Sequence, residues 1–529
     1  MKFALVAGFA GLPLQWFLVT SAGGADLRAH QVAVFALTIV VFLRYGLKRV
    51  EVGNRGAQVF LGANLYMIVL WIALNVYNGV GLVQPIKQLT FVVTFIAVTA
   101  VFFFMVRNGD VELMDALRWT VVATVGVLIA AFGLSMLSNG VNPVDVLQRT
   151  IASGDPNILQ KELFRSSFAG FGLEGEEARG NLRHEVFGGL LFTMYASAWA
   201  VSLRPFTEPR HRAIYRTAMV LAMLLLLVSL SRSILVAAAI WPALSFVRAL
   251  LTGRVSNRQQ VAVLAGLGGV GILAASGFLS VIATRFTEDT SSYNTRENLL
   301  TLAFQRIQDN FWTGGIDVSR TSSHNFVLDM WQRAGIYAGL PALFIFLFIS
   351  LLWYQQLIRI RTVSDSDFVL AAAMALPCVR LVTQGGGSLQ IVEWVTLAMV
   401  IGVQAANRMR DKRGLTPLES EMTAADLQMP ALAGAPGMAR KGTSSPGATP
   451  HRVPFTGAQF LGSRFQRSPF QGGPTSGVRN QSAPFSPAPA RPASPAEVRA
   501  AQVAAARVPH STPKAFRAPI THSTDSDRF

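Results

Sequence analysis

Residues 321–347 read TSSHNFVLDMWQRAGIYAGLPALFIFL, a stretch that changes from half-polar to apolar near Gly335. Residues 335–354 contain no charged side chain. A helix needs about 20 predominantly apolar residues to cross the hydrocarbon core of a bilayer, so this segment predicts a membrane span. The stretch therefore places His324 and Asn325 just outside a membrane boundary.

The composition of the whole chain also indicates a membrane protein. Of its 529 residues, 51% are hydrophobic and 14% are charged, whereas soluble domains average about 25% charged residues. The formal net charge of +17 would suggest nucleic acid as the partner of a soluble protein. No nucleic-acid-binding motif with interleaved aromatic residues is present, so we attribute the charge to membrane orientation and a basic tail. The single cysteine, Cys378, excludes a disulfide within one chain and a cysteine-based metal site.

Apolar runs predict an all-α polytopic membrane fold with about twelve spans. The spans cover residues 3–21, 30–46, 57–77, 88–106, 118–138, 185–203, 213–230, 233–250, 260–283, 335–354, 367–384 and 388–405. The first span follows Met-Lys and shows no small-residue cleavage pattern after Val19, so we expect a retained helix and not a signal peptide.

The Lys and Arg residues of the short loops determine the orientation of these spans. The basic loops lie on one side, together with the segment that starts at Asn407; they are residues 45–56, 204–216, 250–260 and 355–367. Because basic loops stay inside, both termini are expected in the cytoplasm and the protein in the cytoplasmic (inner) membrane. Two long segments, residues 139–184 and 285–334, are then left on the outer side.

The composition changes after about residue 411. Pro, Ala, Ser, Gly and Arg dominate the sequence up to residue 529, and apolar periodicity disappears. Such a segment cannot bury enough apolar surface to offset its chain entropy. We therefore expect residues 1–410 to form the membrane domain and residues 411–529 to form a disordered cytoplasmic tail. Two alternatives remain for this tail: a solvated segment, or an arm that binds a cytoplasmic partner or anionic lipid.

The outer segment 285–334 begins with a predicted amphipathic helix. Asn294 followed three residues later by Glu297 is typical of a helix start. Arg296 precedes Leu300 by four residues, so it extends the apolar stripe of this helix and faces the protein or the membrane surface. Two alternatives fit Arg296: an interfacial arginine that snorkels, or a ligand-binding group.

The stretch quoted above predicts a second helix in the same segment. Ser322 or Ser323 can cap a helix that starts near His324 and ends by Gly335. His324 would then lie in the first turn, where the helix dipole disfavours imidazolium. A neutral imidazole just outside the bilayer can accept a proton, whereas the alternative is a structural histidine.

Charged residues near the ends of spans are further candidates, because such charges usually have a purpose. Arg232, in LVSLSRSILVAA, falls at the outer junction of two spans and has no acidic neighbour in sequence. Its guanidinium suits an anionic ligand such as phosphate. Arg380 and Glu393 map to the outer ends of their spans, where they either line a cavity or form a mutual ion pair. Arg183 and His184 are candidates for lining the same outer cavity.

Two acidic signals are weaker. Asp26, in the first outer loop, has the chemistry of a base in a membrane glycosyltransferase, but nothing around it adds support. Asp365 and Asp367 form the Asp-x-Asp pattern that can hold a divalent metal on a nucleotide sugar. They map to the cytoplasmic side, so we expect acids of a loop and no metal site.

Several motifs occur together between about residues 180 and 350. They are RENLL at 296–300, DNFWTGG at 309–315, the His324–Asn325 pair, the glycines at 335 and 339, and Ser-Arg-Ser at 231–233. Together they resemble the O-antigen ligase and O-antigen polymerase superfamily. The chain departs from that family's pattern at Phe311, where a proline is usual, and in its long basic tail.

The resemblance implies metal-independent glycosyl transfer on the outer face of the cytoplasmic membrane, without a cofactor. The implied donor is a glycan attached to undecaprenyl diphosphate, a lipid carrier that lies among the membrane lipids. The implied acceptor is a hydroxyl of a lipid A core, another lipid-linked glycan or a protein, as in the assembly of surface polysaccharide. By this resemblance, His324 with Asn325 activates the acceptor, while Arg232 and Arg296 bind the donor diphosphate.

A secondary transporter or exporter is the alternative function, since twelve spans with both termini inside suit that class. Symmetry between the two halves of the chain would favour a transporter. The halves have no matching outer segments, and the charges in the spans map to the outer edge instead of the midplane. We therefore favour the transferase, with ligase and polymerase as the two possible forms.

Overall fold

The structure is a computed structural model. It describes residues 1–15, 18–22, 25–45, 55–77, 79, 82–159, 162, 176–253, 271, 274–287, 290–316, 318, 322–383 and 389–414. All of them lie in the first of two units, Met1–Ala439; the second unit is Arg440–Phe529. The predicted tail, and the expectation that it is disordered, lies outside the described residues except for 411–414.

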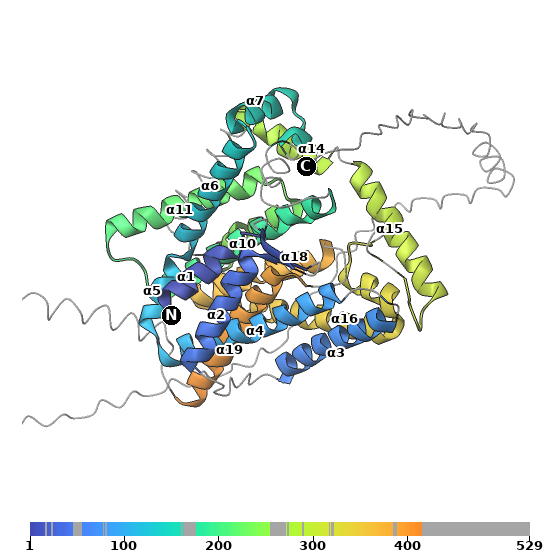
Figure 1. Cartoon of the computed structure of the whole chain (residues 1–529). Helices are drawn as coiled ribbons and strands as arrows, with labels where there is room; N and C mark the ends of the chain where they lie inside the picture. The colour runs from blue at the N-terminus through green and yellow to red at the C-terminus, as the bar shows by residue number, and fades with distance from the viewer. Residues whose placement is uncertain are drawn as a thin grey trace, which may run out of the picture. The chain divides into compact units, whose positions relative to one another are not determined.

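Helices make up nearly all of the described structure (Figure 1). They are α1 (Lys2–Gly11), α2 (Ala29–Tyr45), α3 (Arg55–Tyr77), α4 (Val83–Asn108), α5 (Val111–Arg118), α6 (Thr120–Ser138), α7 (Pro143–Ser153), α8 (Pro156–Ile158), α10 (Glu176–Leu203), α11 (Pro209–Val228), α12 (Arg232–Thr252), α14 (Phe278–Thr287), α15 (Thr290–Asp309), α16 (Phe326–Ile358), α17 (Asp365–Ala373), α18 (Ala375–Thr383) and α19 (Ile391–Lys412). The exception is an antiparallel hairpin of β1 (Leu18–Ala22) and β2 (Ala25–Arg28), which pairs Thr20 with Leu27.

Eight segments of the described chain are helical, long and apolar enough to cross a membrane, so the chain is a multi-pass membrane protein. They are Arg55–Tyr77, Pro85–Asn108, Val111–Ser138, His184–Leu203, Pro209–Val228, Arg232–Thr252, Phe326–Ile358 and Asp365–Thr383. Each corresponds to one predicted span, and these eight predictions are confirmed. The starts of the third and seventh segments lie several residues earlier than predicted, because each span continues an upstream helix.

The first predicted span, residues 3–21, is wrong. Helix α1 ends at Gly11, and β1 begins at Leu18. Pro13 interrupts the helix, since proline has no backbone N–H and clashes with the preceding turn. The 10 residues of α1 extend over about 15 Å, roughly half of the hydrocarbon core. Gly11 instead allows α1 to pack closely on α2, because a Cβ there would lie 2.6 Å from the Cβ of Ala33.

The other three predicted spans differ in outcome. The span at 30–46 corresponds to α2, an apolar helix of 17 residues. The span at 388–405 falls in α19, which is long enough but contains Glu393 and Gln404 and is not among the eight. The span at 260–283 lies largely outside the described residues.

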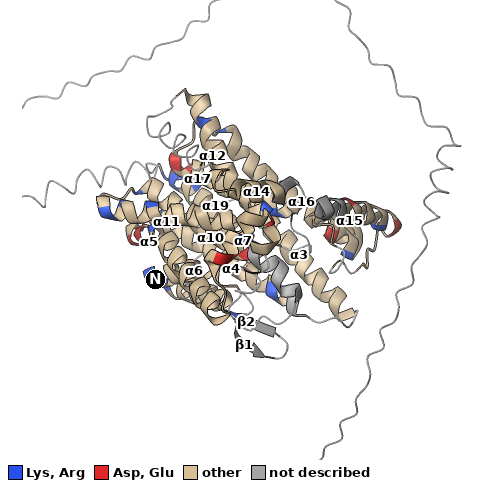
Figure 2. Cartoon of the chain, turned by 90° about the horizontal axis from the view of Figure 1, so that it is seen from above, with Lys and Arg blue, Asp and Glu red and all other residues tan. Residues whose placement is uncertain are grey.

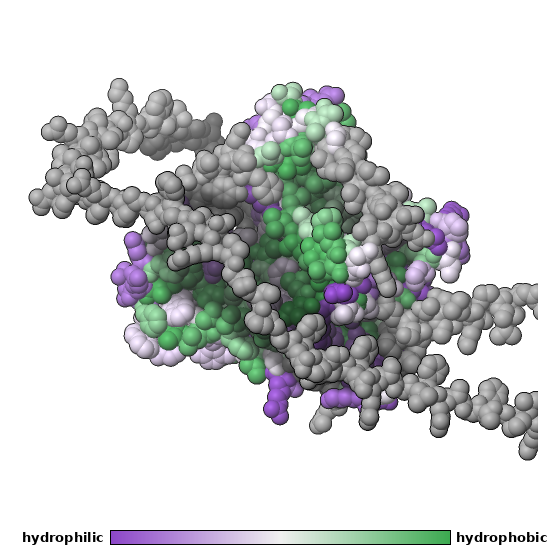
Figure 3. All heavy atoms as spheres, turned by 180° about the vertical axis from the view of Figure 1, so that it is seen from behind, coloured by the Kyte–Doolittle hydropathy of each residue, from purple (hydrophilic) through white to green (hydrophobic). Residues whose placement is uncertain are grey.

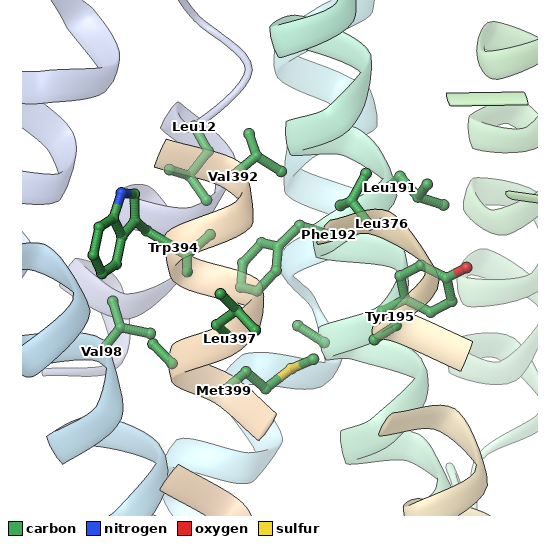
Figure 4. Packing of buried hydrophobic residues seen from close by; sticks show 14 of the residues in the cluster. Leu12, Val98, Leu191, Phe192, Tyr195, Leu376, Val392, Trp394, Leu397 and Met399 are labelled. Carbon is green, nitrogen blue, oxygen red and sulfur yellow. The ribbon is translucent and has the colours of Figure 1, made fainter. Parts of the chain in front are cut away.

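Helix α19 lies at the centre of the packing. It runs along α4 and also contacts α10 and α18, and residues 391–403 are all buried. Gly402 permits the close contact with α4, because a Cβ there would lie 2.7 Å from the carbonyl oxygen of Thr99. Side chains of α19 fill the space between Val98 of α4 and Phe192 of α10 (Figure 4).

The helices around this centre expose apolar side chains. The apolar segment of α11 is 17% buried, whereas His184–Leu203 of α10 is 89% buried. Apolar residues cover wide parts of the surface between hydrophilic ends (Figure 3), and most Lys, Arg, Asp and Glu residues lie near helix ends (Figure 2). A surface of this kind is suited to contact with lipid, and the charged ends mark the membrane boundaries.

Candidate functional site

Several predicted site residues lie at one end of the helix bundle. Gly188, near the apolar start of α10, faces Val392 at the start of α19 and Ile234 at the start of α12. The starts of α4 and α16 and the end of α18 meet the same region through contacts described below. We call this the outer end, after the orientation predicted from the basic loops.

The junction between α11 and α12 presents Arg232. Helix α12 starts at Arg232, with Ser231 as its N-cap residue. Leu230 is fully buried and has a left-handed backbone with φ +50, which is unfavourable by roughly 1–2 kcal/mol for a residue with a side chain. Nδ1 of His184 is hydrogen-bonded to the hydroxyl of Ser231. The structure therefore brings His184 next to the half-buried Arg232.

Arg380 and Glu393 form a buried ion pair. Nε of Arg380 lies 2.6 Å from Oε1 of Glu393, and the two side chains are 4% and 1% exposed. The second carboxylate oxygen accepts a hydrogen bond from the backbone N–H of Gln390 at 2.8 Å, which completes a capping box at the start of α19. The structure thus contains the mutual ion pair, one of the two expectations for these residues.

Glu185 is a charged residue that the sequence analysis did not single out. Lys87, Arg380, Glu393 and Arg28 all lie close enough to act on its carboxylate electrostatically. These charges come from five different elements, namely α10, α4, α18, α19 and β2. Each lies at the edge of an apolar run, and hydrophobic periodicity does not say which edges meet in space. Three cations and two carboxylates therefore form a charged cluster at the outer end.

His324 lies beside the start of α16 but outside the helix. The helix begins at Phe326, and Asn325 is its N-cap: the side-chain oxygen accepts hydrogen bonds from the second and third helical N–H groups at 3.0 and 3.2 Å. The predicted cap at Ser322 or Ser323 is therefore wrong by two or three residues. His324 itself has a left-handed backbone with φ +56. This conformation turns the chain sharply just before the helix.

Asp329, near the start of α16, holds the chain around His324. Its fully buried carboxylate accepts hydrogen bonds from the hydroxyl of Ser322 at 2.6 Å and from the hydroxyl and backbone N–H of Ser323, both at 2.7 Å. The Ser322 hydroxyl in turn accepts from the backbone N–H of His324 at 3.0 Å. Hydrogen bonds to an ionised carboxylate are among the strong ones. The sequence analysis missed Asp329; an acid in the otherwise apolar stretch NFVLDMW was the available signal.

Gly335 turns the chain from the outer segment into the next span. Helix α16 is interrupted at Ala334 and Gly335, where Gly335 has φ +60. The preceding turn packs against this break, and the backbone N–H of Ile336 donates to the carbonyl of Phe311 at 3.0 Å. A Cβ at Gly335 would lie 2.1 Å from the carbonyl oxygen of Trp312, so glycine is required here. The predicted end of a helix at Gly335 is confirmed.

A small cavity lies between the starts of α16 and α4 and the residue before the cap of α19. Phe326, two residues after His324, lines this cavity together with Leu389 and Gln88. Its volume of about 20 Å³ has room for roughly one water molecule. Leu389 immediately precedes the cap of α19, and Gln88 follows Lys87 in α4. The starts of α16, α4 and α19 therefore meet at the outer end.

Three predicted site residues are not described at the level of side chains. Arg183 belongs to α10, Arg296 to α15 and Asp26 to β2, but their side chains lie outside the described part of the structure. Helix α15 starts at Thr290, so the predicted start at Asn294 is wrong. The run Thr-Ser-Ser at 290–292 offers alternative residues for a helix start, and capping preference alone does not choose among them.

The Asp365–Asp367 pair lies away from the outer end, at the start of α17. Asp365 pairs with Arg248 at 2.8 Å and is exposed. Both acids lie in the first turn of α17, so the expectation that they lie in a loop is wrong. In the part of the chain that the structure describes, no group of three or more His, Cys, Asp or Glu residues could hold a metal ion.

No protein-family model matches the sequence, and no curated protein matches it. The function is therefore argued from the residues at the outer end.

Proposed function

We propose that this chain is a membrane glycosyltransferase whose site is at the outer end. The observation that carries the proposal is the His324 loop: a histidine in a left-handed conformation, whose backbone is fixed by a network around a buried carboxylate, at the end of the bundle that also contains the charged cluster. The motif resemblance supplies the substrates, a glycan on undecaprenyl diphosphate as donor and a glycan, lipid or protein hydroxyl as acceptor. The product would belong to cell-surface polysaccharide, made by a polymerase or a ligase.

In this reaction the acceptor hydroxyl attacks the anomeric carbon of the donor sugar. A bond forms from the hydroxyl oxygen to that carbon, the bond from the carbon to the diphosphate oxygen breaks, and the hydroxyl proton passes to the imidazole of His324. The nearby start of α16 supports a neutral imidazole, which is the form that accepts a proton. Asn325 uses its side-chain oxygen as the helix cap, so we assign it the positioning of the loop.

Arg232 and Arg296 are proposed to bind the leaving diphosphate. A guanidinium group forms paired hydrogen bonds with phosphate oxygens, and fixed cations stabilise the charge that develops on the leaving group. Arg232 lies in the first turn of α12, where the helix N-terminus adds positive potential. Lys87 and Arg28 of the charged cluster add further positive charge at this end.

We also propose a complete membrane topology, which adds further spans and an orientation to the eight spans described above. It has about twelve spans, both termini in the cytoplasm, and residues 139–184 and 285–334 outside, in the cytoplasmic (inner) membrane. The exposed apolar side chain of Phe304 on α15 supports contact between this outer helix and the membrane surface.

A secondary transporter is the rival function, and buried charges such as the Arg380–Glu393 pair favour it. These charges lie at helix ends. Glu393 is the third residue of α19, Arg380 lies in the last turn of α18, and Glu185 is the second residue of its apolar segment. Transporters place their coupling sites near the bilayer midplane. The position of the charges therefore supports the transferase.

The test uses purified full-length protein with a lipid-linked glycan donor and no ion gradient. His324→Ala should lower the transfer rate by about 10²–10⁴-fold, as expected for loss of a general base, with donor affinity and thermal unfolding unchanged. His211→Ala, at the start of α11, is the control and should transfer normally. Near-normal turnover of His324→Ala at neutral pH would exclude its role as the base.

Arg232→Lys tests the donor site separately. Lysine keeps the charge but loses the planar fork, so donor affinity should fall while unfolding is unchanged. Donor affinity equal to that of the wild type would rule out this role for Arg232. Failure of the wild-type protein to consume any lipid-linked glycan would argue against the transferase itself.

A further inference from the structure

A larger cavity lies at the opposite end of the bundle from the His324 loop. Its volume is about 280 Å³, and it is lined by the ends of α4, α10 and α19 and by the start of α17. This volume is near the lower limit for pockets that bind small molecules. Asn407 of the cavity is 14 residues after Glu393 in α19, or about 21 Å along the helix. The cavity is therefore separate from the proposed transferase site.

Two carboxylates line this cavity, Asp367 from the first turn of α17 and Asp411 from the end of α19. Asp411 lies close enough to act electrostatically on the half-buried Asp367. Neither carboxylate forms an ion pair with a residue in the described ranges. Arg410 also lines the cavity, so the described lining residues include two carboxylates and one guanidinium. A bound cation would relieve the repulsion between the carboxylates.

The remaining lining residues favour an organic cation over a metal ion. Val106, Leu203 and Val403 form an apolar wall, which suits the carbon atoms next to an ammonium group. The hydroxyls of Ser364 and Ser366, 2.9 Å apart, and the amide of Asn407 provide hydrogen-bond acceptors. Ca²⁺ and Mg²⁺ also bind carboxylate, hydroxyl and amide oxygens, so the experiment below includes Mg²⁺ as a competing outcome.

We propose that this cavity binds a primary ammonium group, placed between Asp367 and Asp411 and against the apolar wall. Arg410 lies in the same lining, so a ligand that carries a phosphate near its amine matches both signs of charge. An aminoethyl phosphate has this chemistry. It is available from two sources, the headgroup of phosphatidylethanolamine and soluble phosphoethanolamine.

The experiment measures thermal unfolding of the full-length protein at constant ionic strength. Phosphoethanolamine should raise the unfolding temperature saturably, ethanolamine should do so at higher concentration, and uncharged ethylene glycol should not, since only a ligand bound to the folded state stabilises it. Nanodiscs of phosphatidylethanolamine are compared with nanodiscs of phosphatidylglycerol. Stabilisation by phosphatidylethanolamine nanodiscs would identify the lipid headgroup as the ligand. Stabilisation by soluble amines alone would identify soluble phosphoethanolamine as the ligand.

Two variants tie the effect to the cavity. Asp367→Asn and Asp411→Asn should each weaken amine affinity about tenfold or more, because each removes a charged acceptor. Asp365→Asn is the matched control, an exposed acid two residues from Asp367 that does not line the cavity. The proposal is overturned if amines give the wild type no saturable stabilisation, if Mg²⁺ gives the same shift, or if both variants bind amine normally. None of these measurements depends on glycan transfer.

Discussion

Replacing Asp329 by alanine should slow glycan transfer by about 150-fold while the protein stays folded. The carboxylate accepts three hydrogen bonds from Ser322 and Ser323, at 2.6 to 2.7 Å. Each hydrogen bond to a charged group contributes about 1.5–3 kcal/mol, but bonds within one network do not add. We therefore take the three hydrogen bonds together to stabilise the position of the His324 loop by about 3 kcal/mol. Loss of this stabilisation in the transition state would slow transfer about 150-fold.

Asp329→Asn separates positioning from simple loss of structure. The amide keeps the shape of the side chain: its oxygen accepts from Ser323 and its NH₂ group donates to the Ser322 hydroxyl. Only the charge assistance is lost, so we expect a decrease of about tenfold. The assay is kcat of the purified protein, together with donor affinity and unfolding temperature. Asp309→Ala, at the exposed end of α15, is the control.

A specific set of results would refute this reasoning. Asp329→Ala with the kcat of the wild type would mean that the hydrogen bonds do not position a catalytic group. Equal losses of kcat, donor affinity and unfolding temperature, with no recovery in Asp329→Asn, would make Asp329 a residue of the fold alone.

Three further predictions concern the membrane domain and the tail. Gly335→Ala should lower the unfolding temperature clearly, because residue 335 has φ +60 and its Cβ would lie 2.1 Å from a carbonyl oxygen. Gly62→Ala is the control: its Cβ would have no atom within 4 Å, so this change should be neutral or stabilising by about 0.5–1 kcal/mol. Arg380→Met or Glu393→Met alone should destabilise by about 3–5 kcal/mol and the double variant by much less; a double variant as unstable as the sum would contradict a structural pair. Removal of the chain after Arg413 should leave membrane insertion and transfer in vitro intact, and loss of activity at normal expression would show that the tail contributes.

The membrane-spanning character could be predicted because length and composition decide it. Eight predicted spans correspond to apolar helical segments, since a helix satisfies its own backbone hydrogen bonds within lipid. The prediction of a span at residues 3–21 failed because Pro13 ends the helix. The proline is visible in the sequence, but the apolar run around it favoured a span. Gly335 was predictable for the opposite reason: a glycine between two helical patterns indicates a break.

The candidate site could be predicted only in part. Single charges at the ends of spans indicated Arg232, Arg380 and Glu393, but the pairing of the last two and the approach of His184 to Ser231 depend on which helices are neighbours. Helix starts were the weakest predictions, because several residues with similar capping preference stand in a row. The structure resolves this at α16, where Asn325 caps the helix and the serines bind a buried acid.

The backbone gives an independent argument for placing function at the outer end. Among the described residues, two that are not glycine have positive φ, Leu230 and His324. Glycine would adopt either conformation with less strain, so a different residue at such a position suggests that its side chain is needed. Leu230 is fully buried and anchors the junction that presents Arg232. His324 is half-buried and its backbone N–H is held by the Ser322 hydroxyl, so its strained turn agrees with the role that we propose for its imidazole.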